Sequence, residues 1–203
     1  MSTFPTSAIS RLRMATDGEG VTTLVCAWGC PLRCAYCLNK FTWDEKTKRE
    51  YLTPRELYDR VRVDSLYFEA TGGGVTFGGG EPLMYAEFFP EFRELCGSKW
   101  KLYAETCLSV PREKVWAAAK AIDGFIVDIK DTDEAIYRAY TGADVSAALD
   151  NLRLLSTLVD PSEIRVRLPL IPDYNTDCDR DRSEAVLRDM GIVNIERFTY
   201  VIR

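Results

Sequence analysis

The 203-residue chain has no histidine, so imidazole is excluded as a base, a nucleophile or a metal ligand. It also has no apolar run that approaches the roughly 20 residues of a membrane-spanning helix. Its first 14 residues lack the apolar segment of a secretory signal. The formal charge of −5 disfavours sequence-independent binding to nucleic acid, because such binding needs an excess of Lys and Arg. These absences predict a cytoplasmic protein with no membrane association and no nucleic-acid partner.

The sequence contains no internal repeat, low-complexity tract or linker, so residues 1–203 are expected to form a single domain. Seven cysteines, an odd number, fit a reducing compartment and metal chemistry better than a disulfide framework. Four of them have no ligand spacing with one another and are expected to be small, buried apolar side chains. These four are Cys26, Cys96, Cys107 and Cys178, of which the last two follow predicted strand ends.

Strand-like and helix-like patterns alternate along the chain. We expect six strands, at about residues 21–28, 75–77, 102–106, 124–130, 164–170 and 195–201. Helices are expected between them, at about residues 54–64, 86–96, 109–120, 146–158 and 179–190. This alternation predicts a parallel sheet with right-handed crossovers. A barrel and a flavodoxin-like open sheet both satisfy the pattern.

Three cysteines, Cys30, Cys34 and Cys37, lie on one predicted loop after the first strand. A structural zinc ion and an electron-transfer cubane each normally take four protein ligands. Three thiols at these spacings therefore indicate a 4Fe–4S cluster with one iron left for an exogenous ligand. The alternative is three reduced cysteines with no metal.

A glycine run, Gly78-Gly79-Gly80-Glu81-Pro82, follows the second predicted strand. Glycines let backbone groups approach a ligand closely, because no Cβ intervenes. The run lacks the spaced glycines of a dinucleotide site and the Gly-Lys-Ser/Thr of a phosphate loop. It indicates either a ligand-binding loop or a tight turn from strand to helix.

Together these two motifs resemble those of the radical S-adenosylmethionine (SAM) superfamily. In that superfamily the open iron chelates the amino and carboxylate groups of SAM, and a Gly-Gly-Glu-Pro motif binds the methionyl amino group. The resemblance assigns Gly78, Gly79, Gly80 and Glu81 to this role. It also implies an α/β fold, an open partial (β/α)6 TIM-like barrel of parallel strands, with its chemistry at the strands' carboxyl ends. It further implies that Tyr36 packs on the adenine ring and that Asn39 bonds near the adenine or the cluster.

Several other stretches resemble glycyl-radical-enzyme activating enzymes of the pyruvate formate-lyase activating enzyme type. They are residues 17–20, 42–44, 72–76, 105–106 and 128–130, together with Arg167. The resemblance implies that Glu105 and Asp128 hold a monovalent cation beside the SAM carboxylate, and that Lys130 and Arg167 contact SAM or the cation site. Charges at the ends of buried strands are costly unless they are paired or face a ligand. A network of ion pairs at the barrel rim is therefore the alternative.

The implied chemistry is reductive cleavage of SAM to a 5′-deoxyadenosyl radical, which then installs a glycyl radical on a partner enzyme. A flavodoxin- or ferredoxin-type protein would supply the electron. This family continues past the sixth strand into a further SAM-binding loop, whereas this chain ends at Arg203, which leaves the substrate open. One alternative is a small-molecule or peptide substrate, as in the similarly compact 7-carboxy-7-deazaguanine synthases. The other is a non-catalytic iron–sulfur protein.

Overall fold

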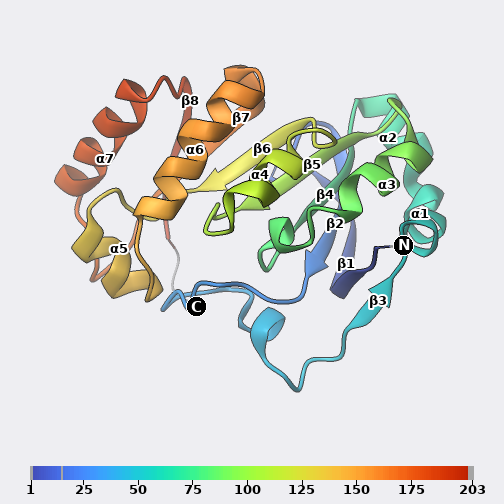
Figure 1. The fold of residues 1–203 in the computed structure, drawn as a ribbon, viewed down its shortest axis with the longest axis horizontal. Helices are drawn as coiled ribbons and strands as arrows, with labels where there is room; N and C mark the ends of the chain where they lie inside the picture. The colour runs from blue at the N-terminus through green and yellow to red at the C-terminus, as the bar shows by residue number, and fades with distance from the viewer. Residues whose placement is uncertain (1, 15, 201–203) are drawn as a thin grey trace.

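The computed structural model describes residues 2–14 and 16–200. A sheet of eight strands runs through it in the order β3-β1-β2-β4-β5-β6-β7-β8 (Figure 1). The strands are β1 (Phe4–Met14), β2 (Val21–Ala27), β3 (Glu50–Leu52), β4 (Gly74–Gly79), β5 (Lys101–Thr106), β6 (Gly124–Asp128), β7 (Ile164–Leu170) and β8 (Asn194–Thr199). The α-helices are α1 (Pro54–Val61), α2 (Ser65–Thr71), α3 (Phe88–Cys96), α4 (Arg112–Ala118), α5 (Glu134–Thr141), α6 (Ser146–Leu158) and α7 (Asp177–Asp189). Short 3-10 helices are η1 (Lys40–Trp43), η2 (Arg62–Asp64), η3 (Pro82–Tyr85) and η4 (Pro161–Glu163).

The six strands expected from the sequence pair in parallel and in chain order, from β2 through β4, β5, β6 and β7 to β8. A flavodoxin-like sheet reverses its strand order at a switch point. No such reversal occurs among the described strands, and the sheet is not closed, because β8 pairs with β7 only. The prediction of an open partial (β/α)6 barrel is confirmed. The last predicted strand was drawn to Val201, which lies outside the described residues.

Two strands and two helices were not expected from the sequence. β1 pairs antiparallel with β2, and β3 pairs antiparallel with the first residues of β1. β1 is rich in polar residues and β3 is only three residues long, so neither has the apolar run that marks the buried strands of a parallel sheet. The helices α2 and α5 are a turn or two long, which is too short for a clear apolar stripe.

A cluster of phenylalanines fixes helix α3 to the sheet. The Phe77 ring of β4 lies 4.9 Å from Phe89 and 5.6 Å from Phe92, both on α3. Phe4 of β1 lies 5.2 Å from Phe77, so the unexpected strand completes this core. Burying each such ring contributes roughly 1.5–3 kcal/mol. The packing holds the β4 end, and with it the glycine run, in a fixed place.

Helix α1 begins where the sequence indicated. Thr53 and Glu56 form a reciprocal capping box, and Pro54 occupies the first helical turn. Among the described residues no helix is both long enough and apolar enough to cross a membrane.

Candidate active site at the carboxyl ends of the strands

The sequence motifs gather at one edge of the sheet. The cysteine segment leaves β2, the glycine run closes β4, and Glu105 and Asp128 end β5 and β6. Arg167 lies opposite Asp128 on the neighbouring strand β7. Because the carboxyl ends of parallel strands meet at the same end of a barrel, these groups face a common space.

Backbone hydrogen bonds hold the cysteine segment in place. The amides of Arg33 and Ala35 donate to the carbonyls of Thr141 and Tyr140, at 2.9 and 3.0 Å. Those two carbonyls belong to the last turn of α5, where the helix itself leaves acceptors free. Figure 1 shows the segment crossing beneath the strands toward α5. Helix α5, which was not expected from the sequence, therefore supports the cysteine segment.

The three motif cysteines are free and half-buried. Burial is the main reason that the pKa of Cys34 is raised to about 11, and the charge of Lys130 acts in the opposite direction. Cys30 and Cys34 both pack against one small apolar cluster. Among residues 2–14 and 16–200, no three His, Cys, Asp or Glu side chains converge on a single metal ion. A cubane differs from a single ion because each thiolate binds its own iron, and soft thiolates are the donors that iron–sulfur clusters take. Three thiolates fit a cluster whose fourth iron is left for an exogenous ligand.

Cys107 lies beside this group, directly after the end of β5. It is buried, and it packs with Leu32 and Tyr137 against Cys30 and Cys34. Its thiol donates to the Glu81 carboxylate at 3.0 Å. The expected burial of Cys26, Cys96 and Cys107 is confirmed, but that of Cys178 is wrong. Cys178 is exposed because it lies in the polar first turn of α7, which faces solvent.

Glu81 is almost wholly buried and accepts four hydrogen bonds from its own chain. One oxygen accepts from the Thr106 hydroxyl at 2.7 Å and the Leu83 amide at 3.0 Å. The other accepts from the amide and the thiol of Cys107, at 2.8 and 3.0 Å. Burial raises the pKa of Glu81, and these bonds oppose that shift. Glu81 thus ties the end of β4 to the end of β5.

Two glycines of the run are required by the chain's own packing. A Cβ at Gly80 would lie 2.2 Å from the Gly29 carbonyl, and Gly79 adopts a φ of +81° with Cys26 directly behind it. Both positions therefore exclude larger residues. Asn39, from the cysteine segment, donates to the Gly79 carbonyl at 3.1 Å. This bond joins the cysteine segment to the glycine run.

The four charged residues predicted at the strand ends form one network. Arg167 donates to Asp128 at 2.7 Å and to Glu105 at 3.2 Å. Lys130 lies 3.1 Å from the other Asp128 oxygen. The structure thus brings together all four residues, as ion pairs among themselves. It does not test the expected contacts of these side chains with SAM or a cation.

Burial and charge act in opposite directions on the two acids. Burial raises the pKa of Asp128, but the charges of Lys130 and Arg167 outweigh it, so the net shift is downward. Burial raises the pKa of Glu105, and Arg167 compensates only in part. The pKa values of Lys130 and Arg167 are both raised, because the nearby acids more than offset burial.

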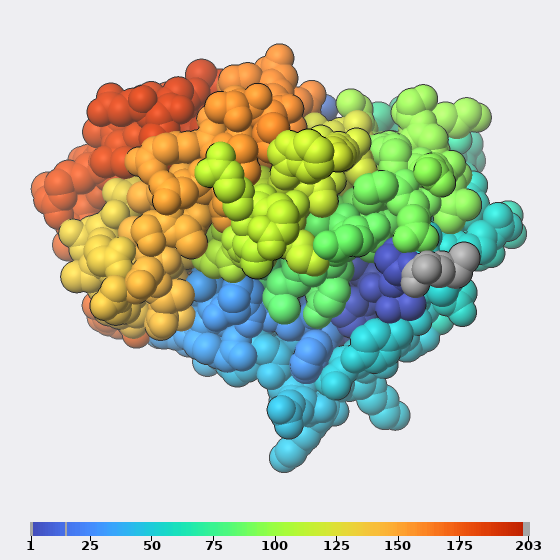
Figure 2. Space-filling view, viewed as in Figure 1, coloured from blue at the N-terminus to red at the C-terminus, as the bar shows by residue number. Residues whose placement is uncertain are grey.

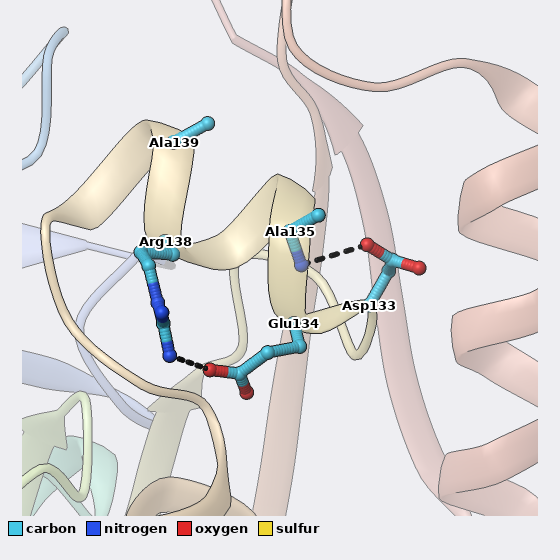
Figure 3. Close-up of a pocket in the computed structure, with 5 residues that line it drawn as sticks. All are labelled: Asp133, Glu134, Ala135, Arg138 and Ala139. Carbon is cyan, nitrogen blue, oxygen red and sulfur yellow. Dashed lines mark hydrogen bonds and ion pairs between the residues drawn. The ribbon is translucent and has the colours of Figure 1, made fainter.

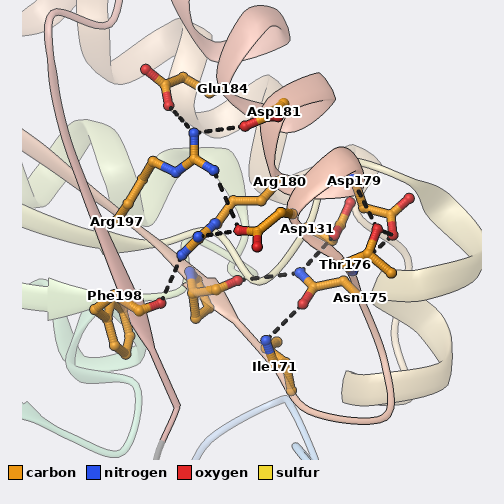
Figure 4. A network of polar contacts seen from close by, with 12 residues as sticks. Asp131, Ile171, Asn175, Thr176, Asp179, Arg180, Asp181, Glu184, Arg197 and Phe198 are labelled. Atoms are coloured by element: carbon orange, nitrogen blue, oxygen red, sulfur yellow. Dashed lines mark hydrogen bonds and ion pairs between the residues drawn. The ribbon is translucent and has the colours of Figure 1, made fainter.

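Aromatic side chains surround Tyr36, the residue before the third cysteine. The Tyr36 ring lies 5.6 Å from Tyr174 and 6.1 Å from Tyr140, and its hydroxyl donates to Asp173 at 3.0 Å. Tyr174 and Asp173 belong to the loop between β7 and α7. That loop is fixed by the neighbouring Asn175, whose amide nitrogen donates to the buried Asp131 at 3.0 Å (Figure 4).

A surface hollow along α5 lies apart from these groups. It is lined by Asp133, Glu134, Ala135, Arg138 and Ala139 (Figure 3). Its charged groups are already engaged, since Arg138 pairs with Glu134 and Asp133 caps the helix. A single short helix supplies its walls and none of the motif residues, so we assign it no role in the site.

Comparison with known proteins agrees with this geometry. The family model of the radical SAM superfamily matches residues 25–183. The chain is 36% identical to the pyruvate formate-lyase-activating enzyme of Clostridium pasteurianum over 126 residues, covering 62% of this chain and 52% of that enzyme. It is 31% identical to the enzyme of the same name from Staphylococcus aureus (strain USA300) over 180 residues, covering 80% of this chain and 67% of that enzyme.

Among solved structures, Streptococcus suis SuiB bound to S-adenosylmethionine has the same fold. Its TM-score is 0.64 at 14% identity, over 85% of this chain and 39% of that one. The present chain spans about half the length of the Clostridium relative. Enzymes of the radical SAM superfamily use a 4Fe–4S cluster and SAM. The chain belongs to this superfamily and, within it, to a family like the glycyl-radical-enzyme activating enzymes.

Proposed function

We propose that this protein cleaves SAM reductively and thereby installs a glycyl radical on a partner enzyme. The observation that carries the proposal is the cysteine segment. Its three free cysteines lie on one short segment that leaves the carboxyl end of β2, and two of them, Cys30 and Cys34, pack against the same apolar cluster. Three thiolates leave one iron of a cubane open, and the named activity of the relatives is the activation of such an enzyme.

We assign the cluster to Cys30, Cys34 and Cys37. When bound, the cluster and SAM would supply the radical chemistry, and the protein's own task is to orient them and exclude water. The glycine run, Asn39 and Tyr36 form the side of the site next to the cysteines. Its other side is the ion-pair network.

The ion-pair network is suited to a zwitterionic ligand. Lys130 and Arg167 are cations that could turn toward a carboxylate, and Asp128 and Glu105 are acids that could turn toward an ammonium group or a monovalent cation. Two acids and two bases leave this region neutral before a ligand arrives. A zwitterion such as the methionyl end of SAM can therefore exchange partners with the network without adding a net buried charge.

The test is anaerobic reconstitution with iron and sulfide, followed by reduction with dithionite in the presence of SAM. We expect methionine and 5′-deoxyadenosine in equal amounts, and an electron-spin signal of a glycyl radical on a purified glycyl radical enzyme. SAM left intact by a fully loaded, reduced cluster would contradict the enzymatic proposal. Cleavage of SAM that proceeds on a peptide or small molecule, with no protein partner, would instead identify the alternative substrate class.

A further inference from the structure

The segment that carries the cluster cysteines is basic, in a protein that is acidic. Between residues 33 and 49 there are five basic and two acidic residues, although the chain as a whole has a charge of −5. The five basic residues are Arg33, Lys40, Lys46, Lys48 and Arg49. The positive charge is thus concentrated next to the site, and the rest of the chain is more negative than the total suggests.

None of these five cations has an acidic partner within ion-pair distance among residues 2–14 and 16–200. Elsewhere in the described chain most arginines are paired, including Arg60 with Glu50 immediately after this segment. Arg33 and Arg49 lie instead over the rings of Trp43 and Trp28, at 5.0 and 3.8 Å. The three lysines are exposed. Figure 2 shows this light-blue to cyan part of the chain protruding below the main body.

Two apolar side chains lie among these lysines. Leu38 directly follows the cluster cysteine Cys37 and is 67% exposed, and Phe41 is 38% exposed. An apolar centre with a charged rim is the usual composition of a protein interface. We call Leu38, Lys40, Phe41, Lys46 and Lys48 the docking patch.

We propose that the docking patch receives the electron donor, a small acidic one-electron carrier protein of the flavodoxin or ferredoxin kind. This inference rests on the proposed function, because the reaction needs one electron for each SAM cleaved. Flavodoxin hydroquinone would give one electron to the oxidised cluster and become the semiquinone, while the cluster charge falls from 2+ to 1+. The patch belongs to the same segment as Cys34 and Cys37, so a carrier bound there lies beside the cluster ligands. Electron-transfer contacts of this kind are small and depend on complementary charge.

The experiment compares two triple variants of the reconstituted protein with equal changes in charge. One is Lys40→Glu/Lys46→Glu/Lys48→Glu in the docking patch. The matched control is Lys99→Glu/Lys101→Glu/Lys120→Glu, whose exposed lysines lie near the amino ends of β5 and β6, away from the site. Stopped-flow absorbance follows reduction of the cluster by flavodoxin hydroquinone at low and high ionic strength.

We expect the patch variant to be reduced at least ~10-fold more slowly at low salt, while the control stays within about 2-fold of the wild type. Added salt should slow the wild type and remove most of this difference, because exposed charges are screened. Leu38→Ala, which changes no charge, should slow reduction at every ionic strength. Dithionite should reduce all the variants and support SAM cleavage equally, so a failure of the docking proposal is distinct from a failure of the proposed function.

Reduction by flavodoxin that is unaffected in the patch variant, or slowed equally in the control, would overturn the proposal. Two other occupants of the patch can be identified in the same variants. If flavodoxin reduces the patch variant at the wild-type rate but that variant installs the glycyl radical more slowly with dithionite, the docking patch binds the glycyl radical enzyme. If flavodoxin reduces the patch variant at the wild-type rate but that variant no longer binds a single-stranded RNA oligonucleotide that the wild type binds, the docking patch is a nucleic-acid surface.

Discussion

The two sides of the candidate site are held together by different forces. On the cysteine side, backbone bonds fix the segment to α5, and backbone packing fixes the glycine run against β2. On the opposite side, the strands β6 and β7 are paired through the backbone, but side-chain ion pairs join Arg167 and Lys130 to Asp128 and Glu105. Backbone bonds survive most substitutions, whereas a buried ion pair leaves an unpaired charge when one partner is removed. We therefore expect truncation of the Cys34 or Asn39 side chain to cost little stability, although Gly79 and Gly80 cannot be enlarged. On the charged side, removal of one partner should lower the free energy of unfolding.

The largest effect is expected from removal of a cluster ligand. Cys34→Ala should abolish cluster binding and SAM cleavage, yet hardly change the unfolding of the metal-free protein, because the backbone bonds of its segment remain. Iron content and the visible absorbance of the reconstituted protein measure the first effect. Cys96→Ala is the control, since Cys96 is buried on α3 and should leave cluster binding intact. Normal iron content in Cys34→Ala would contradict the assignment.

The next effect concerns the charged side. Arg167→Met removes the only described group that contacts both acids, and should lower the free energy of unfolding by about 3 kcal/mol. Denaturant unfolding of the metal-free protein measures the change. Arg197→Met is the matched control, because Arg197 pairs with Asp181 and Glu184 at the surface, where such pairs contribute about 0–1 kcal/mol (Figure 4). An equal loss of unfolding free energy in Arg167→Met and Arg197→Met would show that the buried ion pairs stabilise the protein no more than the surface ion pairs do.

The pH dependence of stability should separate the two acids. The folded-state pKa of Glu105 is raised above its ordinary 4.5, so the folded state keeps this proton longer than the unfolded state does. Its contribution is therefore complete below pH 4.5 and is lost as pH rises through the raised pKa. The stability advantage of the wild type over Glu105→Gln should shrink from pH 4 to pH 7, as measured by urea unfolding. An advantage that grows over this range would contradict the raised pKa.

Asp128 should behave in the opposite way. Its folded-state pKa lies below the ordinary 3.8, so its contribution is complete above pH 3.8 and is lost only as pH falls further. Between pH 4 and pH 7, the stability difference between the wild type and Asp128→Asn should stay constant. A slope in this range would show that Lys130 and Arg167 do not outweigh burial.

The smallest effect on stability is expected from a change on the cysteine side at a residue that is not a proposed cluster ligand. Asn39→Ala removes one hydrogen bond to the Gly79 carbonyl and should lower the free energy of unfolding by about 1 kcal/mol. Iron content should be unchanged, since no ligand is lost. Denaturant unfolding and iron analysis of the same preparation test both statements. A loss of cluster binding would mean that this single side-chain bond, rather than the backbone, holds the segment.

The sequence was most informative where chemistry needs particular residue types. The spacing of Cys30, Cys34 and Cys37, the glycine run and the six parallel strands could all be read from it, because each is a local pattern. It could not reveal that α5 accepts hydrogen bonds from the cysteine segment, since helix and segment are about a hundred residues apart. It also gave no sign that the Cys107 thiol bonds to Glu81.

By itself the sequence indicated the cysteine spacing, the glycine run and the six parallel strands with five of their helices, because spacing and hydrophobic periodicity are properties of neighbouring residues. The tertiary structure alone decided that Arg167 bridges Glu105 and Asp128 and that β1 completes the phenylalanine core. It also decided that, within the part of the chain that the structure describes, the cations of the cysteine segment have no acidic partner. Each of these depends on which distant side chains share a space. Burial and long-range charge, which set their energies, exist only once the chain has folded.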